Sequence, residues 1–242
     1  MENQFSRTET LIGNEALDKL SKSRVAVFGV GGVGGYVVEA LARAGVGSID
    51  LIDNDDINIT NINRQIIALH STIGKSKVDI AKERILDINP NIKVFTHKIF
   101  FTPETSNDFD FTKYDYIVDA IDSVTGKIEL VIKAQENNIP IIASMGTGNK
   151  LHPEMFEVSD IYKTSVCPLA KVMRYELRKR NIKNVKVLYS NEEPIDITKH
   201  PIELELLKEN PHKHQIPGSI AFVPSVAGIM LAQKVVMDLM EK

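Results

Sequence analysis

A run of residues near the start of the chain has the types and the spacing of a phosphate-binding turn. Residues 25–28 are apolar and predict a buried parallel strand. Gly29 then allows a tight bend, Gly31 lets the backbone approach a phosphate, and Gly34 lets the next helix pack on the strand. The N-terminus of that helix would present free N–H groups to an anion. The pattern predicts a nucleotide site without choosing its ligand, because several dinucleotides and ATP are bound by such turns.

Charged side chains that could act on a polyphosphate follow this turn. Arg64 is planar and can hold phosphate oxygens at two points, and Lys77 offers a compact positive charge. Asp122 offers the hard oxygen ligands that Mg²⁺ prefers. Negative charge that grows on a leaving phosphate group could be stabilised by these residue types. Taken singly, each could instead cap a helix or decorate a solvated face.

Alternating strands and helices must position these residues. Strand patterns cover residues 25–28, 49–52, 92–96, 114–120 and 140–143, and helical patterns cover 15–20, 37–44, 75–89 and 127–137. This alternation predicts an α/β fold with a doubly wound, mainly parallel, Rossmann-like sheet. Ligands then bind outside the carboxyl ends of the strands, where the glycine turn, Asp53 and Asp122 all fall.

After Gly148 the alternation of strand and helix patterns is less regular. We expect residues 1–150 to form the ATP-binding region and residues 151–242 to form a C-terminal α+β extension of the same domain. Strands are expected at 155–159 and 185–189, and helices at 168–180 and 227–240. Residues 191–217 are polar and rich in proline, which predicts a long loop.

Composition narrows the class of protein. Of the 242 residues, 43% are hydrophobic and 25% charged, and the net charge of -3 demands no nucleic-acid partner. The single cysteine, Cys167, excludes an internal disulfide and a multi-cysteine zinc site. Pro224, Gln233, Lys234 and Asp238 interrupt the most apolar late stretch, and the N-terminus lacks the apolar core of a signal peptide. We therefore expect a soluble cytoplasmic protein with no integral membrane segment.

Five motifs, in matching order and spacing, resemble the ubiquitin-activating-type (ThiF–MoeB-like) adenylating superfamily. They are the glycine turn, Asp53, Asn-Ile-Asn-Arg-Gln at 61–65, Gly-Lys-Ser-Lys at 74–77 and Asp-Ala-Ile-Asp-Ser at 119–123. The resemblance implies ATP and Mg²⁺ as cofactors, with Arg64, Lys77 and Asp122 as catalytic residues and Asp122 as the metal ligand. It implies further ATP contacts from Gly29, Gly31, Gly32, Gly34, Asp53, Asp55, Asn61, Asn63 and Gln65, and from Arg7 reaching the ATP of a partner subunit.

Additional motifs are similar to the tRNA threonylcarbamoyladenosine dehydratase branch of this superfamily. They lie at residues 5–13, 120–123, 144–146, 159–164, 168–171 and 221–228. The resemblance implies that the threonyl carboxylate of the modified adenosine in tRNA is adenylated, and that the neighbouring carbamoyl group then displaces AMP. It also implies a homodimer and tRNA partners with NNU anticodons that decode ANN codons, and it leaves room for a sulfur-transfer protein.

Such a cyclisation needs no protein nucleophile, because the attacking group is tethered to the electrophile. Cys167 stands where this branch usually has an aspartate, and we expect it to be buried or idle. Two alternatives stay open. One is an activator of a small sulfur-carrier or ubiquitin-like protein, although the chain has no Cys-x-x-Cys pair. The other is a nicotinamide-dependent oxidoreductase or a non-catalytic nucleotide-binding module, which the glycine turn alone permits.

A basic face on the predicted helix 168–180 is a candidate for binding RNA. Lys171, Arg174 and Arg178 are spaced three and four residues apart, so they share one side of the helix. This side is either an ordinary solvated surface or a contact for tRNA phosphates.

Overall fold

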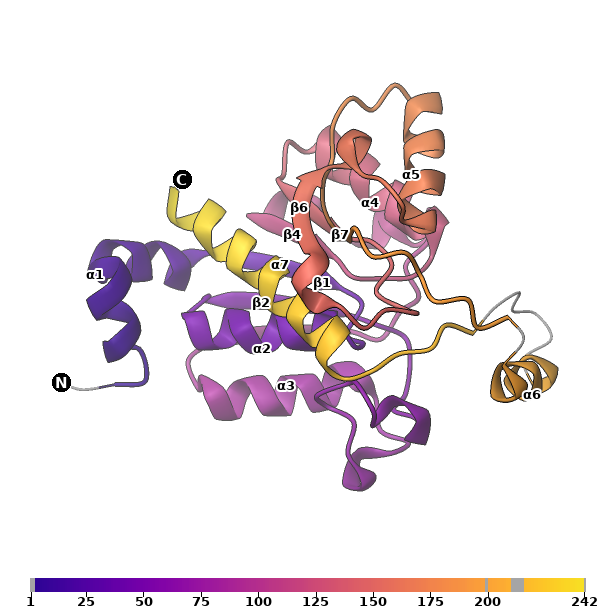
Figure 1. The fold of residues 1–242 in the computed structure, drawn as a ribbon. Helices are drawn as coiled ribbons and strands as arrows, with labels where there is room; N and C mark the ends of the chain where they lie inside the picture. Colours follow the sequence, from indigo (N-terminus) through magenta and orange to yellow (C-terminus); the bar gives the residue numbers. More distant parts are fainter. Residues whose placement is uncertain (1–2, 199, 210–215, 242) are drawn as a thin grey trace.

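A seven-stranded sheet with the strand order β3-β2-β1-β4-β5-β7-β6 organises the fold (Figure 1). The computed structural model describes residues 3–198, 200–209 and 216–241. Neighbouring strands run parallel across β3 (Lys93–His97), β2 (Ser48–Ile52), β1 (Arg24–Phe28), β4 (Tyr116–Asp119), β5 (Ile141–Ser144) and β7 (Lys186–Ser190). The edge strand β6 (Phe156–Asp160) pairs antiparallel with β7. The predicted doubly wound, mainly parallel sheet is confirmed, and strands from beyond Gly148 extend it.

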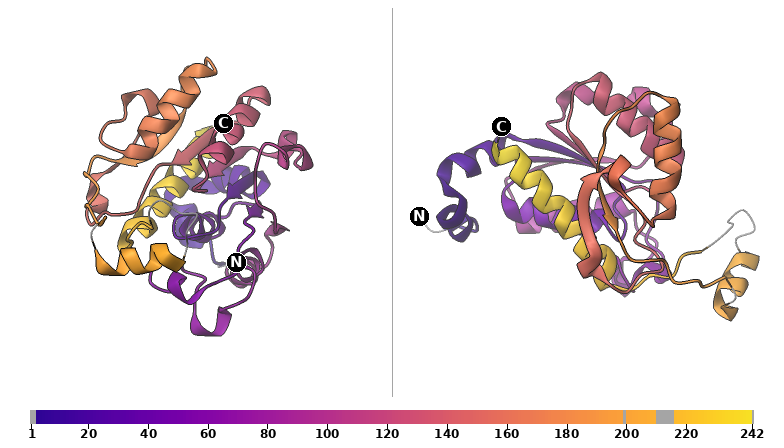
Figure 2. Two further views of the ribbon diagram at one scale, coloured as in Figure 1. Left: turned by 90° about the vertical axis from the view of Figure 1, so that its right-hand side faces the viewer. Right: turned by 45° about the horizontal axis from the view of Figure 1, so that its top comes forward.

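Helices cover both faces of the sheet, which explains why β1 is apolar on both faces from Val25 to Phe28. On one face Val25 and Val27 pack in a core with α2 (Gly34–Ala44), α3 (Lys77–Ile88) and α7 (Phe222–Glu241). On the other face Ala26 and Phe28 pack with α4 (Val124–Glu136), while α5 (Pro168–Lys179) packs beside α4 in a further cluster. Figure 2 shows these helices on opposite sides of the sheet.

Helix α7 closes the fold against α2. A side chain at Gly228 would place its Cβ 2.4 Å from the carbonyl oxygen of Val33, so only glycine permits this close approach. Val223, Leu231 and Val235 are buried in the same core. By length and composition α7 is the one described helix that could cross a membrane, yet in the structure its inward face is used for this packing.

Two helices differ from the expectations. The first, α1 (Ser6–Lys22), starts well before the predicted residues 15–20 and kinks at Gly13, whose φ is 81°. The prediction of a continuous loop over 191–217 is wrong, because α6 (Pro201–Glu209) lies within it. Proline at the first helical position loses no hydrogen bond, and the Glu, Leu and Lys residues that follow are strong helix formers. In Figures 1 and 2, α6 stands apart from the sheet.

Candidate nucleotide site

The glycine turn lies at the carboxyl end of β1, beside the loop that follows β4. Gly29 has φ 90°, and a Cβ there would lie 2.6 Å from the carbonyl oxygen of Ala120. A Cβ at Gly34 would lie 1.7 Å from the carbonyl oxygen of Gly29. Both positions therefore require glycine. Since β1 lies between β2 and β4, the direction in which the strands are added reverses here, and such switch points are where open α/β sheets bind ligands.

Asp53 and Lys77 meet next to this turn. The Asp53 carboxylate accepts hydrogen bonds from the backbone N–H of Val30, at 2.7 Å, and from that of Asp55, at 2.9 Å. Lys77 opens α3 and is 5% exposed, with its Nζ 2.6 Å from Asp55 Oδ2 and 3.8 Å from Asp53 Oδ1. Asp53 thus fixes the backbone of the glycine turn at Val30. The buried ammonium of Lys77 is held between the carboxylates of Asp53 and Asp55.

Arg64 is held by its own segment, which begins at the short 3₁₀ helix Ile59–Asn61. Its Nη1 donates to the carbonyl oxygen of Thr60, at 2.9 Å, and to Asn63 Oδ1, at 2.8 Å. Burial lowers the pKa of the guanidinium from its ordinary value, because the charged form is partly desolvated. Asn61 Oδ1 accepts from the backbone N–H of Asn58, so it shapes this segment.

Gln65 offers an unused polar atom beside the turn. Its side chain is 6% exposed, and its Oε1 has no hydrogen-bond partner among the residues that the structure describes. Its Nε2 lies 3.7 Å from where a Cβ of Gly31 would be. Buried polar atoms are normally satisfied, so this amide oxygen fits a ligand group that donates a hydrogen bond beside the turn.

Asp122 lies in the loop between β4 and α4 and is exposed. It directly precedes Ser123, whose side chain caps α4 by accepting from the backbone N–H of Gly126. The described residues contain no group of three or more His, Cys, Asp or Glu side chains that could hold a metal. A lone carboxylate suits Mg²⁺ only when phosphate oxygens complete the coordination, and this is the usual manner of Mg²⁺ binding with nucleotides.

The buried ion pair between Lys127 of α4 and Asp119 at the end of β4 was not predicted from the sequence. Lys127 Nζ donates to Asp119 Oδ1, at 2.9 Å, and to the carbonyl oxygen of Ser144, at 2.7 Å, and both charged side chains are fully buried. Burial raises the pKa of the Asp119 carboxyl, and the neighbouring Lys127 opposes that rise. The available signal was that Lys127 falls on the apolar face of α4, three and four residues before Leu130 and Val131.

Arg7 is not brought to the other site residues within one copy of the chain. It is exposed on α1, which leads into the first residue of β1 and so lies at the amino ends of the strands (Figure 1). The glycine turn is at the opposite ends. Arg7 is therefore too far from the glycine turn of its own copy to contact ATP there. A contact with ATP would have to be made at the turn of a second copy.

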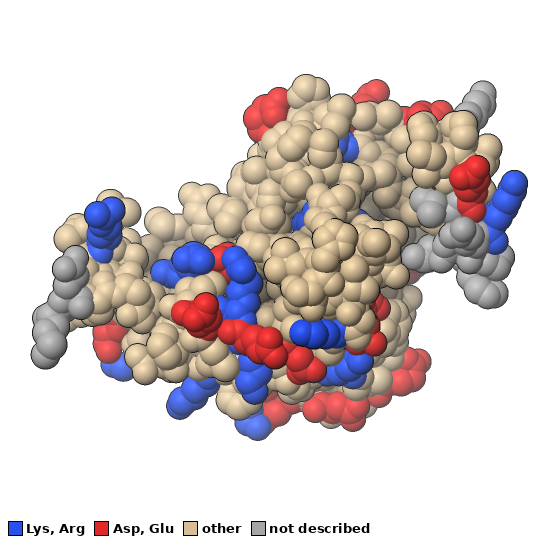
Figure 3. Space-filling view, turned by 90° about the horizontal axis from the view of Figure 1, so that it is seen from below, with Lys and Arg blue, Asp and Glu red and all other residues tan. Residues whose placement is uncertain are grey.

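One of the three basic side chains on the proposed RNA face of α5 is hydrogen-bonded within the protein. Lys171 is exposed, and the Arg178 guanidinium lies 5.2 Å from the ring centre of Tyr162. Arg174 is partly buried, and its Nη1 donates to the hydroxyl and, at 3.0 Å, to the carbonyl oxygen of Thr164. Arg174 therefore anchors the segment before α5. Elsewhere, on the face seen from below, positive and negative side chains are intermixed (Figure 3).

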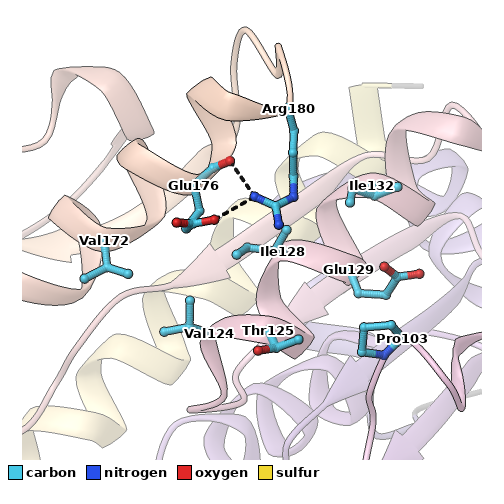
Figure 4. A pocket seen from close by; sticks show the side chains of 9 residues that line it. All are labelled: Pro103, Val124, Thr125, Ile128, Glu129, Ile132, Val172, Glu176 and Arg180. Carbon is cyan, nitrogen blue, oxygen red and sulfur yellow. Dashed lines mark hydrogen bonds and ion pairs between the residues drawn. The ribbon is translucent and has the colours of Figure 1, made fainter.

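A cavity of ≈ 310 Å³ lies between α4 and α5. Figure 4 shows Val124, Ile128 and Val172 around it and the Glu176–Arg180 ion pair at its edge. Cys167 is buried and reduced, at the residue before α5. Neither feature contains a residue predicted for ATP.

Comparison with known proteins connects this geometry to a family. The ThiF family model matches residues 5–242. The chain is 47% identical to the tRNA threonylcarbamoyladenosine dehydratase of Bacillus subtilis, an alignment that covers 100% of this chain and 96% of that protein. It is 40% identical to the Escherichia coli protein of the same name, over 72% of this chain and 65% of that one.

Solved structures agree with the sequence matches. The Escherichia coli tRNA N6-threonylcarbamoyladenosine dehydratase in complex with ATP superposes with a TM-score of 0.87 at 32% identity, covering 98% of this chain and 94% of that one. The Escherichia coli protein MccB with ATP has a TM-score of 0.68 at 21% identity and shares the fold alone.

Proposed function

The chain belongs to the ThiF family, and from this premise we propose that it is an ATP-dependent adenylating enzyme acting on threonylcarbamoyladenosine in tRNA. In the first step, a threonyl carboxylate oxygen attacks the α-phosphate of ATP, and pyrophosphate leaves. In the second step, the neighbouring carbamoyl group attacks the activated carbonyl carbon, AMP leaves with the carboxylate oxygen, and a ring closes. The modified nucleoside loses one water overall.

One observation carries this proposal: the similarity to the Bacillus subtilis dehydratase covers 100% of this chain and 96% of that protein, and so includes residues outside the nucleotide turn. An ATP complex of a 32% identical dehydratase has the same fold across 98% of this chain. A nucleotide-binding module or a nicotinamide-dependent enzyme would share the turn but not the later motifs. The orphaned Gln65 amide oxygen supports a ligand at the turn.

The residues divide the chemistry between them. We propose that the turn and the N-terminus of α2 bind the phosphates, and that Asp53, whose carboxylate accepts from the Val30 N–H, binds a ribose hydroxyl. Arg64 and Lys77 stabilise the negative charge that grows on the pyrophosphate. Asp122 would hold Mg²⁺, which neutralises phosphate charge when bound. The attacking group is part of the substrate, so the reaction uses no thiol, in agreement with a buried Cys167.

The remaining parts of the proposal concern partners. The enzyme works in the cytoplasm as a homodimer on tRNAs with NNU anticodons, with Lys171 and Arg178 as candidate phosphate contacts. These residues are exposed on α5.

The direct test is mass spectrometry of nucleosides after the protein is incubated with ATP, Mg²⁺ and tRNA that carries threonylcarbamoyladenosine. We expect loss of one water from that nucleoside and stoichiometric AMP and pyrophosphate. tRNA that lacks the modification is the control and should give neither product. Unchanged nucleoside with the modified tRNA would refute the proposed substrate.

An alternative is an activator of a small carrier protein. The adenylyltransferase and sulfurtransferase UBA4 of Saccharomyces cerevisiae is 35% identical over 133 residues, but this covers 54% of this chain and 30% of that protein. Adenylation would then occur on a C-terminal glycine carboxylate. Pyrophosphate release that depends on a carrier protein and not on tRNA would favour this alternative.

A further inference from the structure

Asn149 stands at a junction of three chain segments near the carboxyl edge of the sheet. Its backbone has φ 59°, a left-handed conformation that asparagine tolerates better than most residues. Its Oδ1 accepts from the N–H of Gly218, at 2.7 Å, and its own N–H donates to the carbonyl oxygen of Gly218, at 2.9 Å. Its carbonyl oxygen accepts from Ile195 N–H, at 2.8 Å.

These bonds fix a strap, residues 217–219, across the edge of the sheet. A Cβ at Gly148 would lie 2.6 Å from Cβ of Pro217, so the strap packs closely on the loop that follows β5. One residue after Gly218, the carbonyl oxygen of Ser219 accepts from Asn63 Nδ2, at 2.9 Å. The strap thus joins the loop after β5 to the segment that carries Arg64.

The connection ends on a proposed catalytic group. Asn63 uses both ends of its side-chain amide, since Nδ2 donates to the strap and Oδ1 accepts from Arg64 Nη1 at 2.8 Å. Fixing Nδ2 fixes the direction of Oδ1, because the amide is planar. The Arg64 guanidinium is partly buried and depends on such neighbours for its orientation.

We propose that Asn149 is a positioning residue, which orients Arg64 through the strap and Asn63. This rests on the proposed function in one respect: Arg64 is taken as the group that binds the phosphates of ATP. We call this connection, from Asn149 through the strap and Asn63 to Arg64, the relay. It links the loop after β5 to the segment that carries Arg64, which is far away in the sequence.

The test compares three substitutions of one side chain. Asn149→Ala removes the Oδ1 acceptor. Asn149→Gly removes it and relieves the left-handed backbone, and Asn149→Asp keeps an acceptor oxygen in place. Asn138→Ala is the matched control, because Asn138 has φ 55° after α4 and no part in the relay.

The first readout is ATP affinity by calorimetry together with hydrogen–deuterium exchange of residues 216–220. We expect Asn149→Ala and Asn149→Gly to weaken ATP binding about fivefold, the effect of one hydrogen bond. Exchange at Gly218 should accelerate in both, Asn149→Asp should restore both measurements, and Asn138→Ala should leave both unchanged. Because neither readout uses tRNA, both still test the relay if the protein proves inactive on tRNA.

The second readout is coupling between the two ends of the relay. In an Asn63→Ala background, Asn149→Ala should weaken ATP binding by less than about twofold further, since the connection is already cut. Additive effects of the two substitutions, or faster Gly218 exchange with unchanged ATP affinity, would show that Asn149 only fastens the loop, and would overturn the proposal.

Discussion

The three proposed catalytic side chains are held by the protein to different degrees. Lys77 is buried against Asp55, Arg64 donates to Thr60 and Asn63, and Asp122 is exposed. Both cations therefore have oxygen partners within the protein. ATP must replace those partners with phosphate oxygens, so its binding energy is a difference between two sets of interactions. Groups that bind more strongly as charge moves to pyrophosphate would raise the rate.

Asp122→Ala should slow adenylation by roughly 10² to 10³-fold, the range seen when one electrostatic group is removed from a transition state. ATP binding should weaken much less, because the turn and the cations remain. Pyrophosphate exchange and calorimetry measure the two effects separately. Asp87→Ala, on the exposed side of α3, is the control and should behave like the wild type. Loss of ATP affinity with unchanged turnover would contradict the assignment.

Lys127→Met should destabilise the fold by about 3–5 kcal/mol, because it leaves the Asp119 carboxylate buried without its counter-charge. Denaturant unfolding gives the free energy. The double substitution Lys127→Met with Asp119→Leu should recover part of the loss, since no unpaired charge then remains. If the double substitution proved the less stable, the buried charge would not be the cause.

At the scale of elements, α5 combines packing and surface roles. Its inward residues Ala170, Met173 and Leu177 are buried, and Arg174 fastens the preceding segment. Lys171 and Arg178, seven residues apart, remain for a partner on the same side of the helix.

Charge reversal at Lys171 and Arg178 should therefore weaken tRNA binding while ATP binding is kept. The dependence of tRNA affinity on salt should also become flatter, because fewer counterions are released. Filter binding across a salt series measures both quantities. Reversal at Lys22 on α1 and Arg43 on α2, both exposed, controls for the change of net charge. An unchanged salt slope would place the RNA contact elsewhere.

Contacts between β1, β2 and β3 should make stability depend on pH. Asp50 is fully buried, 2.7 Å from Arg24 Nε and 3.0 Å from His97 Nε2. Burial acts to raise its pKa, but hydrogen bonds from His97 and Arg24 outweigh burial and hold the pKa below its ordinary value. A lowered folded-state pKa contributes stability that is complete above the unfolded pKa and is lost as the pH falls through the folded one.

We therefore expect the free energy of unfolding to decrease as the pH falls below about 5. Urea unfolding across this range provides the measurement. Asp50→Asn should lose stability at neutral pH and show a shallower decrease in acid, since it removes this carboxyl while Glu39 and Asp238 remain. Equal slopes in both proteins would mean that other carboxyls dominate.

Much of this arrangement could be predicted from local patterns. The glycine turn, the strand that ends at Asp119 and the helix after Pro168 each follow from neighbouring residues, and the structure has them. Contacts such as Asn149 with Gly218 and Lys127 with Ser144 depend on where distant segments meet, and no local pattern contains that information. Helix α6 does not follow from the local pattern for another reason, because a polar, proline-rich segment indicates a loop although proline is also favoured at the first position of a helix.

At the scale of the whole molecule, the two ends of the sheet have separate roles. The carboxyl ends hold the residues that we propose bind the nucleotide, and α1 with Arg7 lies at the amino ends (Figure 1). In a homodimer that brings α1 of one copy to the glycine turn of the other, the amino ends of one sheet would meet the carboxyl ends of the other.

Mixing Arg7→Ala with Asp122→Ala tests that arrangement. Each variant alone should be nearly inactive, whereas random mixing gives heterodimers with one intact site, and hence roughly a quarter of wild-type activity. Pyrophosphate exchange after co-refolding measures it, with light scattering to confirm the dimer. Absence of recovery in a confirmed dimer would show that Arg7 does not act across subunits.

The contact between α7 and the glycine turn bears on how the protein is made. Pro224 lies 3.4 Å from where a Cβ of Gly32 would be, and Lys19 Nζ donates to the carbonyl oxygen of Met240 at 3.2 Å. A ribosome releases the N-terminal strands and the turn long before it releases α7. Until then the side of α2 that packs on α7 has no cover, and the proposed phosphate site lacks the contact from Pro224. A nascent chain must therefore wait for its last helix before it can bind ATP, and a message cut short before α7 would yield no competent nucleotide site.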